Sequence, residues 1–220
     1  MHVAPPVLYP FCKHVLLGPV VRRRVDLEVS GVENIPARGP VIIAANHLAE
    51  VDSLILPLST RRQLSFFAKS EYFTGSGIRG LLSRWFLTGT GQIRVDRSGD
   101  DGALAAAEQV LTAGGAWAIY PEGTRSPDGR LHRGHTGALR VARRVPGTLV
   151  VPVALSGTAE VNPPGTRRMV PGRVTVRIGV PLPVSDLVGA DADIRSGTDR
   201  LMATIRTLGG LDYVDEYAQR

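Results

Sequence analysis

The sequence is poor in cysteine, lysine and aromatic residues. Its one cysteine, Cys12, cannot form an internal disulfide framework, and a single thiol fits a reducing compartment. No spacing of cysteine and histidine suggests a zinc site, and we expect no metal. Lys13 and Lys69 are the only lysines among 26 basic residues, so the net charge of +6 rests mainly on arginine.

A long apolar run is also absent. The apolar stretch Val15–Val21 is shorter than the roughly 18 residues that a membrane-spanning helix needs, and the first residues do not have the pattern of a signal peptide. Arg22, Arg23 and Arg24 follow the stretch directly. A short apolar segment that ends in basic residues is typical of a helix at a membrane interface. The alternative is a helix packed on the core with solvated arginines.

The charge balance limits the classes of partner. A pI of about 10.1 indicates an anionic partner, such as nucleic acid, an anionic membrane surface or a phosphorylated substrate. Only 5% of the residues are aromatic, and no nucleic-acid-reading helix is recognisable, so nucleic acid is not expected. The length of 220 residues favours one domain with a sizeable core.

The hydrophobic pattern predicts alternating strands and helices. Val25–Ser30 alternates as a half-buried strand does, and Val41–Ala45 is a continuous apolar run, typical of a strand buried on both faces. This alternation predicts an α/β fold with a largely parallel central sheet flanked by helices. Further strands are expected at Leu64–Ala68, Gln92–Val95, Ala116–Tyr120, Leu149–Ala154 and Arg173–Ile178, and helices at Ser53–Leu58, Ile78–Phe86, Ala103–Thr112, Gly137–Arg144 and Ala192–Leu208.

Two polar motifs begin where predicted buried strands end. His47 has a carboxylate, Asp52, five residues later, the minimum for a general base and the group that orients it. The second motif, Glu122–Ser126, combines a glutamate, a glycine turn, a hydroxyl and an arginine, which suits a phosphate. Open α/β sheets place their active sites at the carboxyl ends of strands. The two motifs therefore predict one site for chemistry on a phosphorylated alcohol.

Each motif also has an ordinary structural interpretation. Asp52 would cap the helix that begins at Ser53 while His47 is a turn residue. The stretch from Glu122 to Arg125 would be a solvated β-turn. The proline at position 152, inside an apolar run, predicts an edge strand or a bulge.

Four blocks, His47–Asp52, Gly91–Arg97, Glu122–Ser126 and Val150–Ala154, follow one another along about half of the chain. Together they resemble the blocks of the glycerolipid acyltransferases of the 1-acylglycerol-3-phosphate O-acyltransferase type. Arg94 stands where that family usually has a bulky apolar residue, whereas Arg97 stands at the position of the family's arginine.

The resemblance implies a reaction and a set of site residues. An acyl group would pass from acyl-CoA or acyl-ACP to 1-acylglycerol 3-phosphate, giving phosphatidate, with His47 as general base and Asp52 orienting it. No cofactor beyond the thioester co-substrate is implied. The block around Val151 and Pro152 would line the acyl-donor region. The residues expected near the acceptor phosphate are Arg97, Glu122, Gly123, Thr124, Arg125 and Lys69, the last having the alternative of an ordinary strand-end lysine.

The resemblance also implies where the protein acts. Residues 1–24 are expected to form a membrane-interface segment, and residues 25–220 a single acyltransferase domain. The expected location is the cytoplasmic face of the cell membrane, as a peripheral or monotopic protein. The expected partners are lysophosphatidate, an acyl thioester and an anionic membrane surface. The residues leave open another acceptor, such as glycerol 3-phosphate or a glycolipid, a non-catalytic lipid-binding protein, and the oligomeric state.

Overall fold

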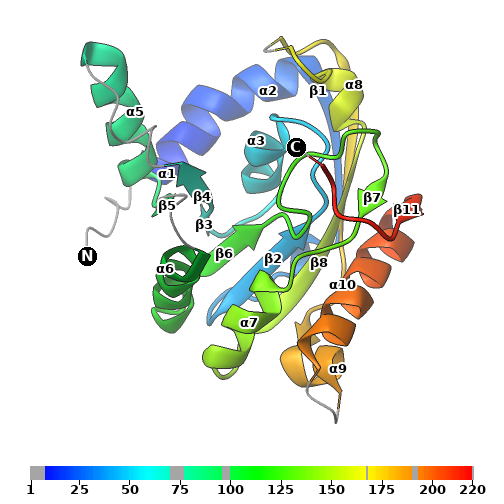
Figure 1. Ribbon diagram of the computed structural model, residues 1–220. Helices are drawn as coiled ribbons and strands as arrows, with labels where there is room; N and C mark the ends of the chain where they lie inside the picture. The colour runs from blue at the N-terminus through cyan, green and yellow to red at the C-terminus, as the bar shows by residue number, and fades with distance from the viewer. Residues whose placement is uncertain (1–7, 70–76, 96–99, 167, 190–192, 220) are drawn as a thin grey trace.

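The computed structural model describes residues 8–69, 77–95, 100–166, 168–189 and 193–219 (Figure 1). Its main sheet has seven strands in the order β1, β9, β8, β2, β6, β3, with β10 paired to β8. Neighbouring strands are parallel, except that β9 and β10 run antiparallel to β8. The predicted α/β fold with a largely parallel sheet is therefore confirmed. The strands are β1 (Val25–Ser30), β2 (Val41–Ala45), β3 (Leu64–Ser65), β6 (Ala116–Ile119), β8 (Leu149–Ser156), β9 (Gly172–Ile178) and β10 (Leu182–Pro183).

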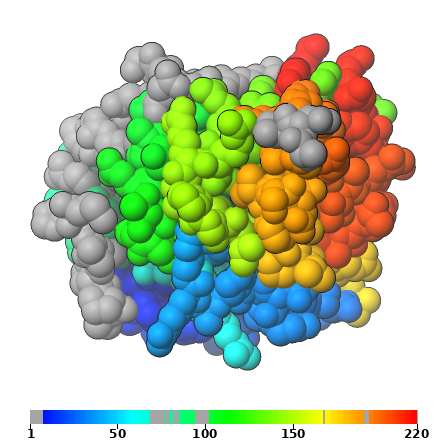
Figure 2. All heavy atoms as spheres, turned by 90° about the horizontal axis from the view of Figure 1, so that it is seen from below, coloured from blue at the N-terminus to red at the C-terminus, as the bar shows by residue number. Residues whose placement is uncertain are grey.

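Helices cover both faces of this sheet. In β2, Val41 and Ile43 belong to one hydrophobic core, while Ile42 and Ala44 belong to the other. Both faces are buried, which explains why β2 is a continuous apolar run. Figure 2 shows the molecule of Figure 1 from below, and on the face seen there the helices α7 (Gly137–Arg144) and α9 (Val184–Val188) lie side by side. The first core is covered by α2 (Gly18–Arg24), α3 (Asp52–Leu58) and α8 (Thr158–Val161), and the second by α6 (Asp100–Thr112), α7 (Gly137–Arg144), α9 (Val184–Val188) and α10 (Ile194–Gly209).

The N-terminal segment is helical, as expected, and is only partly buried. It runs through α1 (Leu8–Phe11), a π-helical turn η1 (Cys12–Leu17) and α2, and it lies beside α5 (Gly77–Gly89) in Figure 1. Val21 is 2% exposed and belongs to the core, whereas Val15 is 61% exposed. The segment therefore packs on the core with one side and presents apolar side chains with the other. No helix within the described residues is long and apolar enough to cross a membrane.

One predicted strand, 64–68, is wrong in its extent. It divides into β3 of the main sheet and β4 (Phe67–Lys69), which pairs with β5 (Ile93–Val95) in a separate small sheet. Between them, the N–H of Phe66 donates to the side-chain oxygen of Gln92 at 3.0 Å. A side chain thus takes the place of a strand partner at the junction. The remaining short elements are η2 (Val32–Asn34), β7 (Leu131–His132) and β11 (Tyr213–Val214).

Pro152 does not lie on an edge strand, so this part of the prediction is wrong. Strand β8 is central: it pairs with β2 along one side from Leu149 to Val153. Along its other side the partner changes from β10, at Leu149 and Val150, to β9, which begins at Val153. The residue without an N–H falls at this change of partner, where a regular ladder is interrupted.

Candidate active site

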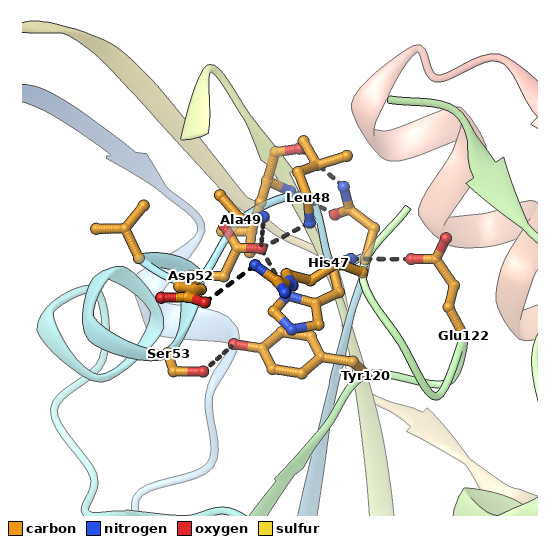
Figure 3. Close-up of polar contacts among 12 residues, drawn as sticks. His47, Leu48, Ala49, Asp52, Ser53, Tyr120 and Glu122 are labelled. Carbon is orange, nitrogen blue, oxygen red and sulfur yellow. Dashed lines mark hydrogen bonds and ion pairs between the residues drawn. The ribbon is translucent and has the colours of Figure 1, made fainter. Parts of the chain in front are cut away.

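The loops that follow β2 and β6 lie side by side because these strands are parallel neighbours. Ala44 pairs with Ile119, and His47 and Glu122 each come three residues later. The main chain of His47 contacts the second motif on both sides. Its N–H donates to Glu122 Oε1 at 2.9 Å, and its C=O accepts from the N–H of Ser126 at 2.7 Å. The two motifs therefore meet at one edge of the sheet, as expected (Figure 3).

His47 and Asp52 form a hydrogen-bonded pair. Nδ1 of His47 lies 2.8 Å from Asp52 Oδ2, and the same oxygen accepts from the N–H groups of Leu48 at 2.7 Å and Ala49 at 2.8 Å. Asp52 is fully buried, while the His47 side chain is 16% exposed. The contact with a carboxyl oxygen assigns the ring proton to Nδ1. Nε2 is thus left with a free lone pair that can accept a proton.

The Asp52 side chain does not cap α3 in the ordinary way. Asp52 is the first residue of that helix, and its carboxyl group bonds to main-chain N–H groups of the preceding loop. The positive end of the helix dipole favours a negative charge at this position. Asp52 therefore orders the loop 47–51 and holds the imidazole at the same time.

Tyr120 packs against one face of the His47 imidazole. Its ring stacks on that of His47 with centroids 3.9 Å apart and planes inclined by 10°, as Figure 3 shows. The Tyr120 hydroxyl lies 3.4 Å from Ser53 Oγ. Burial, and then the nearby Asp52 carboxylate, raise the pKa of Tyr120 well above its usual value, so the phenol is neutral. Tyr120 directly follows β6, so its position near the site could be inferred from the sequence. Its stacking on His47 could not, because no sequence pattern indicates that contact.

Glu122 links the histidine loop to a second loop. Oε1 accepts from the N–H of His47, and Oε2 accepts from the N–H of His132 at 2.9 Å. The residue is 1% exposed. Burial raises the pKa of Glu122 to about 7, although the hydrogen bonds from His132 and His47 act in the opposite direction. Both carboxyl oxygens are engaged inside the protein, so these contacts support a positioning role rather than the direct phosphate contact that the resemblance implies.

Arg125 is the accessible cation of the second motif. Its side chain is 46% exposed and pairs with Glu50, 58% exposed, at 3.1 Å. Thr124, beside it, is half-buried. Gly123 has a φ of 75°, and a Cβ on it would approach His135 Cδ2 to 2.9 Å. A side chain at 123 would therefore be strained both by the left-handed backbone and by the imidazole of His135.

Two asparagines, whose roles the sequence did not indicate, fix the ends of the histidine loop. The Asn46 amide is 1% exposed and both donates to the C=O of Leu155 at 3.0 Å and accepts from its N–H at 2.7 Å. It thus continues the pairing of β2 with β8 by one residue. Asn162, 5% exposed, accepts from the N–H of Val51 at 3.2 Å. Amide side chains that replace strand or turn partners leave no periodic pattern in a sequence.

The other predicted residues are less informative or lie elsewhere. Lys69 pairs through its main chain with Val95 in the small sheet, and its side chain lies outside the described part of the structure, as does the whole of Arg97. Val151 and Pro152 are buried in the sheet and do not line the apolar cavity described below. Within the described residues, no group of three or more His, Cys, Asp or Glu side chains is placed to hold a metal ion.

An apolar cavity of about 370 Å³ lies along α3, the helix that begins at Asp52. Its walls come from the N-terminal helices, α3, residues 66–68 and α5. Ser53, which contacts Tyr120, lines this cavity. Ser53 and Tyr120 therefore link the wall of this cavity to the potential general base.

The chain matches a known protein family over the residues that contain both motifs. The family model described as Acyltransferase matches residues 26–156, more than half of the chain. A chloroplastic 1-acyl-sn-glycerol-3-phosphate acyltransferase of Arabidopsis thaliana is 29% identical over 191 residues, which cover 85% of this chain and 47% of that protein. A protein of Chlamydomonas reinhardtii with the same activity in its name is 34% identical over 158 residues, covering 70% and 46%. The chain spans about half the length of these two relatives.

A solved structure shares the fold. The crystal structure of the 1-acyl-sn-glycerophosphate (LPA) acyltransferase PlsC from Thermotoga maritima superposes with a TM-score of 0.69 at 26% sequence identity. The superposition covers 88% of this chain and 79% of that chain. The mixed sheet and its helical layers are therefore common to both proteins.

The raised pKa of Glu122 predicts a pH dependence of folding stability. The folded protein keeps a proton on Glu122 that the unfolded chain releases near the usual glutamate pKa of 4.5. The contribution of Glu122 to the unfolding free energy is therefore largest at low pH and falls as the pH rises to about 7. The unfolding free energy of the wild type, relative to that of Glu122→Gln, is expected to fall by about 3 kcal/mol across this window. Urea unfolding at a series of pH values measures it.

Glu50→Gln is the matched control, because Glu50 is an exposed glutamate of the neighbouring loop. Its stability curve should run parallel to that of the wild type over the same pH range. A Glu122→Gln curve that also runs parallel would show that the carboxyl group titrates normally and is not held in a buried site.

Proposed function

Since this chain belongs to the acyltransferase family, we propose that it transfers an acyl group from an acyl thioester to the free hydroxyl of 1-acylglycerol 3-phosphate, giving phosphatidate. Three features support the proposal: the His47–Asp52 pair, an apolar cavity whose wall includes the next residue, Ser53, and an exposed arginine in the second motif. A lysophospholipid acceptor and a fatty thioester donor need these three features together. Acyl-CoA and acyl-ACP both fit as the donor.

In this mechanism His47 acts on the acceptor hydroxyl. Nε2 takes the hydroxyl proton while the oxygen attacks the thioester carbonyl carbon. The C–S bond then breaks, and the imidazolium returns the proton to the departing thiolate. Asp52 keeps the proton on Nδ1 and stabilises the imidazolium, while Tyr120 fixes the plane of the ring. No step of this scheme needs a metal ion or a further cofactor.

The acceptor phosphate is proposed to lie against Arg125. Its pairing with Glu50 is solvent-exposed, and such pairs contribute only about 0–1 kcal/mol, so the guanidinium can exchange this partner for a phosphate. Thr124 adjoins this position, and Gly123 allows the loop to turn there. Arg97 and Lys69 are kept as proposed phosphate contacts on the family resemblance alone.

Glu122 is proposed to act through other residues. It positions the main chain of His47 and the loop at His132, with no contact to the phosphate. Val151 and Pro152 are likewise proposed to support the donor region from within the sheet, since both are buried. The apolar cavity is the proposed place for an acyl chain, because it is lined mostly by hydrocarbon side chains and lies along α3.

Residues 1–24 are proposed to lie at a membrane surface on its cytoplasmic side, with residues 25–220 as the acyltransferase domain. Val15, Leu16 and Val20 are each more than half exposed, and three arginines end the same helical segment. Apolar side chains next to basic ones suit the boundary of an anionic bilayer. The alternative acceptors are glycerol 3-phosphate, whose phosphate the same arginine would bind, and a glycolipid, which would use the histidine pair without this phosphate contact. A non-catalytic lipid-binding protein would have no need of the ordered histidine pair.

Removing the base is expected to abolish most of the activity. His47→Ala should lower kcat by about 10²–10⁴, because general-base assistance contributes that much in enzymes. Asp52→Asn should also lower kcat strongly, with little change in KM for lysophosphatidate. Steady-state formation of phosphatidate with detergent-dispersed acceptor measures both. His14→Ala, which removes an exposed histidine, is the control. A folded His47→Ala protein with more than about a tenth of the wild-type kcat would refute the general base.

The arginine of the second motif is expected to determine acceptor affinity. Arg125→Lys should raise KM for lysophosphatidate and change KM for the donor much less, since lysine cannot provide the planar, two-pronged donor of a guanidinium. Arg130→Lys, a change in the same loop, should leave both KM values near those of the wild type. A rise in the donor KM instead would assign Arg125 to the phosphates of the coenzyme and reverse the proposed arrangement.

The arginines that end α2 are expected to contribute to membrane binding. Replacement of Arg22, Arg23 and Arg24 by Gln should weaken cosedimentation with anionic vesicles by roughly 1 kcal/mol per residue. Activity on vesicle-embedded acceptor should fall, and activity on detergent-dispersed acceptor should change less. Added salt should weaken wild-type binding by screening these charges. Arg206→Gln on α10 is the control, and binding insensitive to both salt and the triple substitution would place the docking surface elsewhere.

A further inference from the structure

A lysine is buried in the wall of the apolar cavity. Lys13 is 7% exposed and lies in the π-helical turn η1, between α1 and α2. Its Nζ donates to the C=O of Thr60, just beyond the end of α3. A π-helical turn in an otherwise α-helical segment is an unfavourable local geometry that is often found at functional sites. The burial of Lys13 at this turn therefore suggests that the residue has a function.

Lys13 lies farther along the direction of α3 than Ser53, the cavity residue that contacts Tyr120. Ser53, Leu54, Pro57 and Leu58 of α3 line the cavity one after another, beginning next to Tyr120. The main-chain hydrogen bonds of Ser59 and Thr60 continue the helical turn. A rise of about 1.5 Å per residue places Thr60 about 10 Å beyond Ser53 along the helix. A chain that enters beside Ser53 and follows α3 therefore approaches the lysine.

Three other polar side chains of this wall already have partners inside the protein. The Tyr9 hydroxyl accepts from the N–H of Leu64, Thr90 donates to the C=O of Phe86, and Gln92 accepts from Phe66. For Lys13, the described residues supply one acceptor, the C=O of Thr60, and no carboxylate lines the described part of the cavity. Burial, and then the positive charge of Arg22, lower the pKa of Lys13. Charged or neutral, its nitrogen has further hydrogen atoms to donate.

We propose that Lys13 is a specificity-determining residue that selects among acyl chains by their far ends. The inference rests on the proposed function, in which this cavity holds the acyl chain of the donor. A hydrocarbon end pressed against Lys13 would leave its remaining N–H groups without partners, which is costly in a buried site. A chain that stops short of Lys13 avoids this cost. A chain that carries a hydroxyl or keto oxygen at its far end offers the missing acceptor.

The test compares acyl-CoA donors of increasing chain length with and without a terminal hydroxyl. For the wild type, kcat/KM should fall at the length at which an unsubstituted chain reaches Lys13. At that length the terminal hydroxyl should raise kcat/KM about tenfold, the value of one good hydrogen bond. At shorter lengths the hydroxyl should have no such benefit. This comparison needs no substitution, so it does not depend on whether a variant folds.

Variants assign the effect to the lysine. Lys13→Met keeps an unbranched side chain but has no donor, so it should accept the longer unsubstituted chains and lose the advantage of the hydroxyl. His14→Gln, a change of an exposed residue in the same turn that does not line the cavity, should keep the wild-type profile. A wild-type profile that is indifferent to the hydroxyl at every length would overturn the proposal, as would a folded Lys13→Met protein with an unchanged profile.

A separate measurement distinguishes this proposal from the proposed reaction. Absence of acyl transfer from every donor would refute the reaction but not the polar end of the cavity. Displacement of a fluorescent lipid probe by a long primary alcohol and by the corresponding α,ω-diol still tests the cavity directly. The diol should compete about tenfold better with the wild type and no better with Lys13→Met. Equal competition by the two compounds with the wild type would overturn the role of Lys13 even if the enzyme is active.

Discussion

The geometry of the site depends on two hydrogen bonds made by the main chain of His47. Its N–H is bound by the buried carboxyl group of Glu122 and its C=O by the N–H of Ser126. Both partners belong to the motif after β6, whereas His47 follows β2. Unpairing a buried group of this kind costs about 1–3 kcal/mol, and more when it is charged. The histidine therefore cannot leave its position without breaking the contact between the two motifs, and the parallel pairing of β2 with β6 brings them to the same edge.

Burial separates the polar residues of the site by their roles. Asp52, Glu122 and Asn46 are almost inaccessible, and their contacts are largely to main-chain groups. Arg125 and Glu50, in contrast, are about half exposed and contact each other weakly. A catalytic base needs a fixed orientation, which buried hydrogen bonds supply, and a phosphate needs an accessible cation. The apolar cavity, bounded by helices from distant parts of the chain, adds a third environment.

The sequence predicted the parts of this arrangement that depend on local pattern. The extents of β2 and β6 follow from continuous apolar runs, and the His47–Asp52 pair follows from its spacing after a buried strand. The antiparallel direction of β9 could not be predicted, because alternation of apolar residues is the same in either direction. The buried contacts of Glu122 could not be predicted either, because composition does not show which carboxylate of a motif is buried. The cavity could not be predicted, because its lining includes Tyr9, Ser53 and Phe86, which are far apart in sequence.

Acyl transfer to a phosphorylated lysolipid can be tested with the purified protein and a panel of acceptors. Lysophosphatidate, glycerol 3-phosphate and an uncharged monoacylglycerol would each be supplied with acyl-CoA and with acyl-ACP, and the products identified by mass. If the proposed function is correct, phosphatidate formed from lysophosphatidate will be the main product, and the uncharged acceptor will be acylated little. Transfer that is equally fast to the acceptor without a phosphate, or no transfer to any of the three, would contradict it.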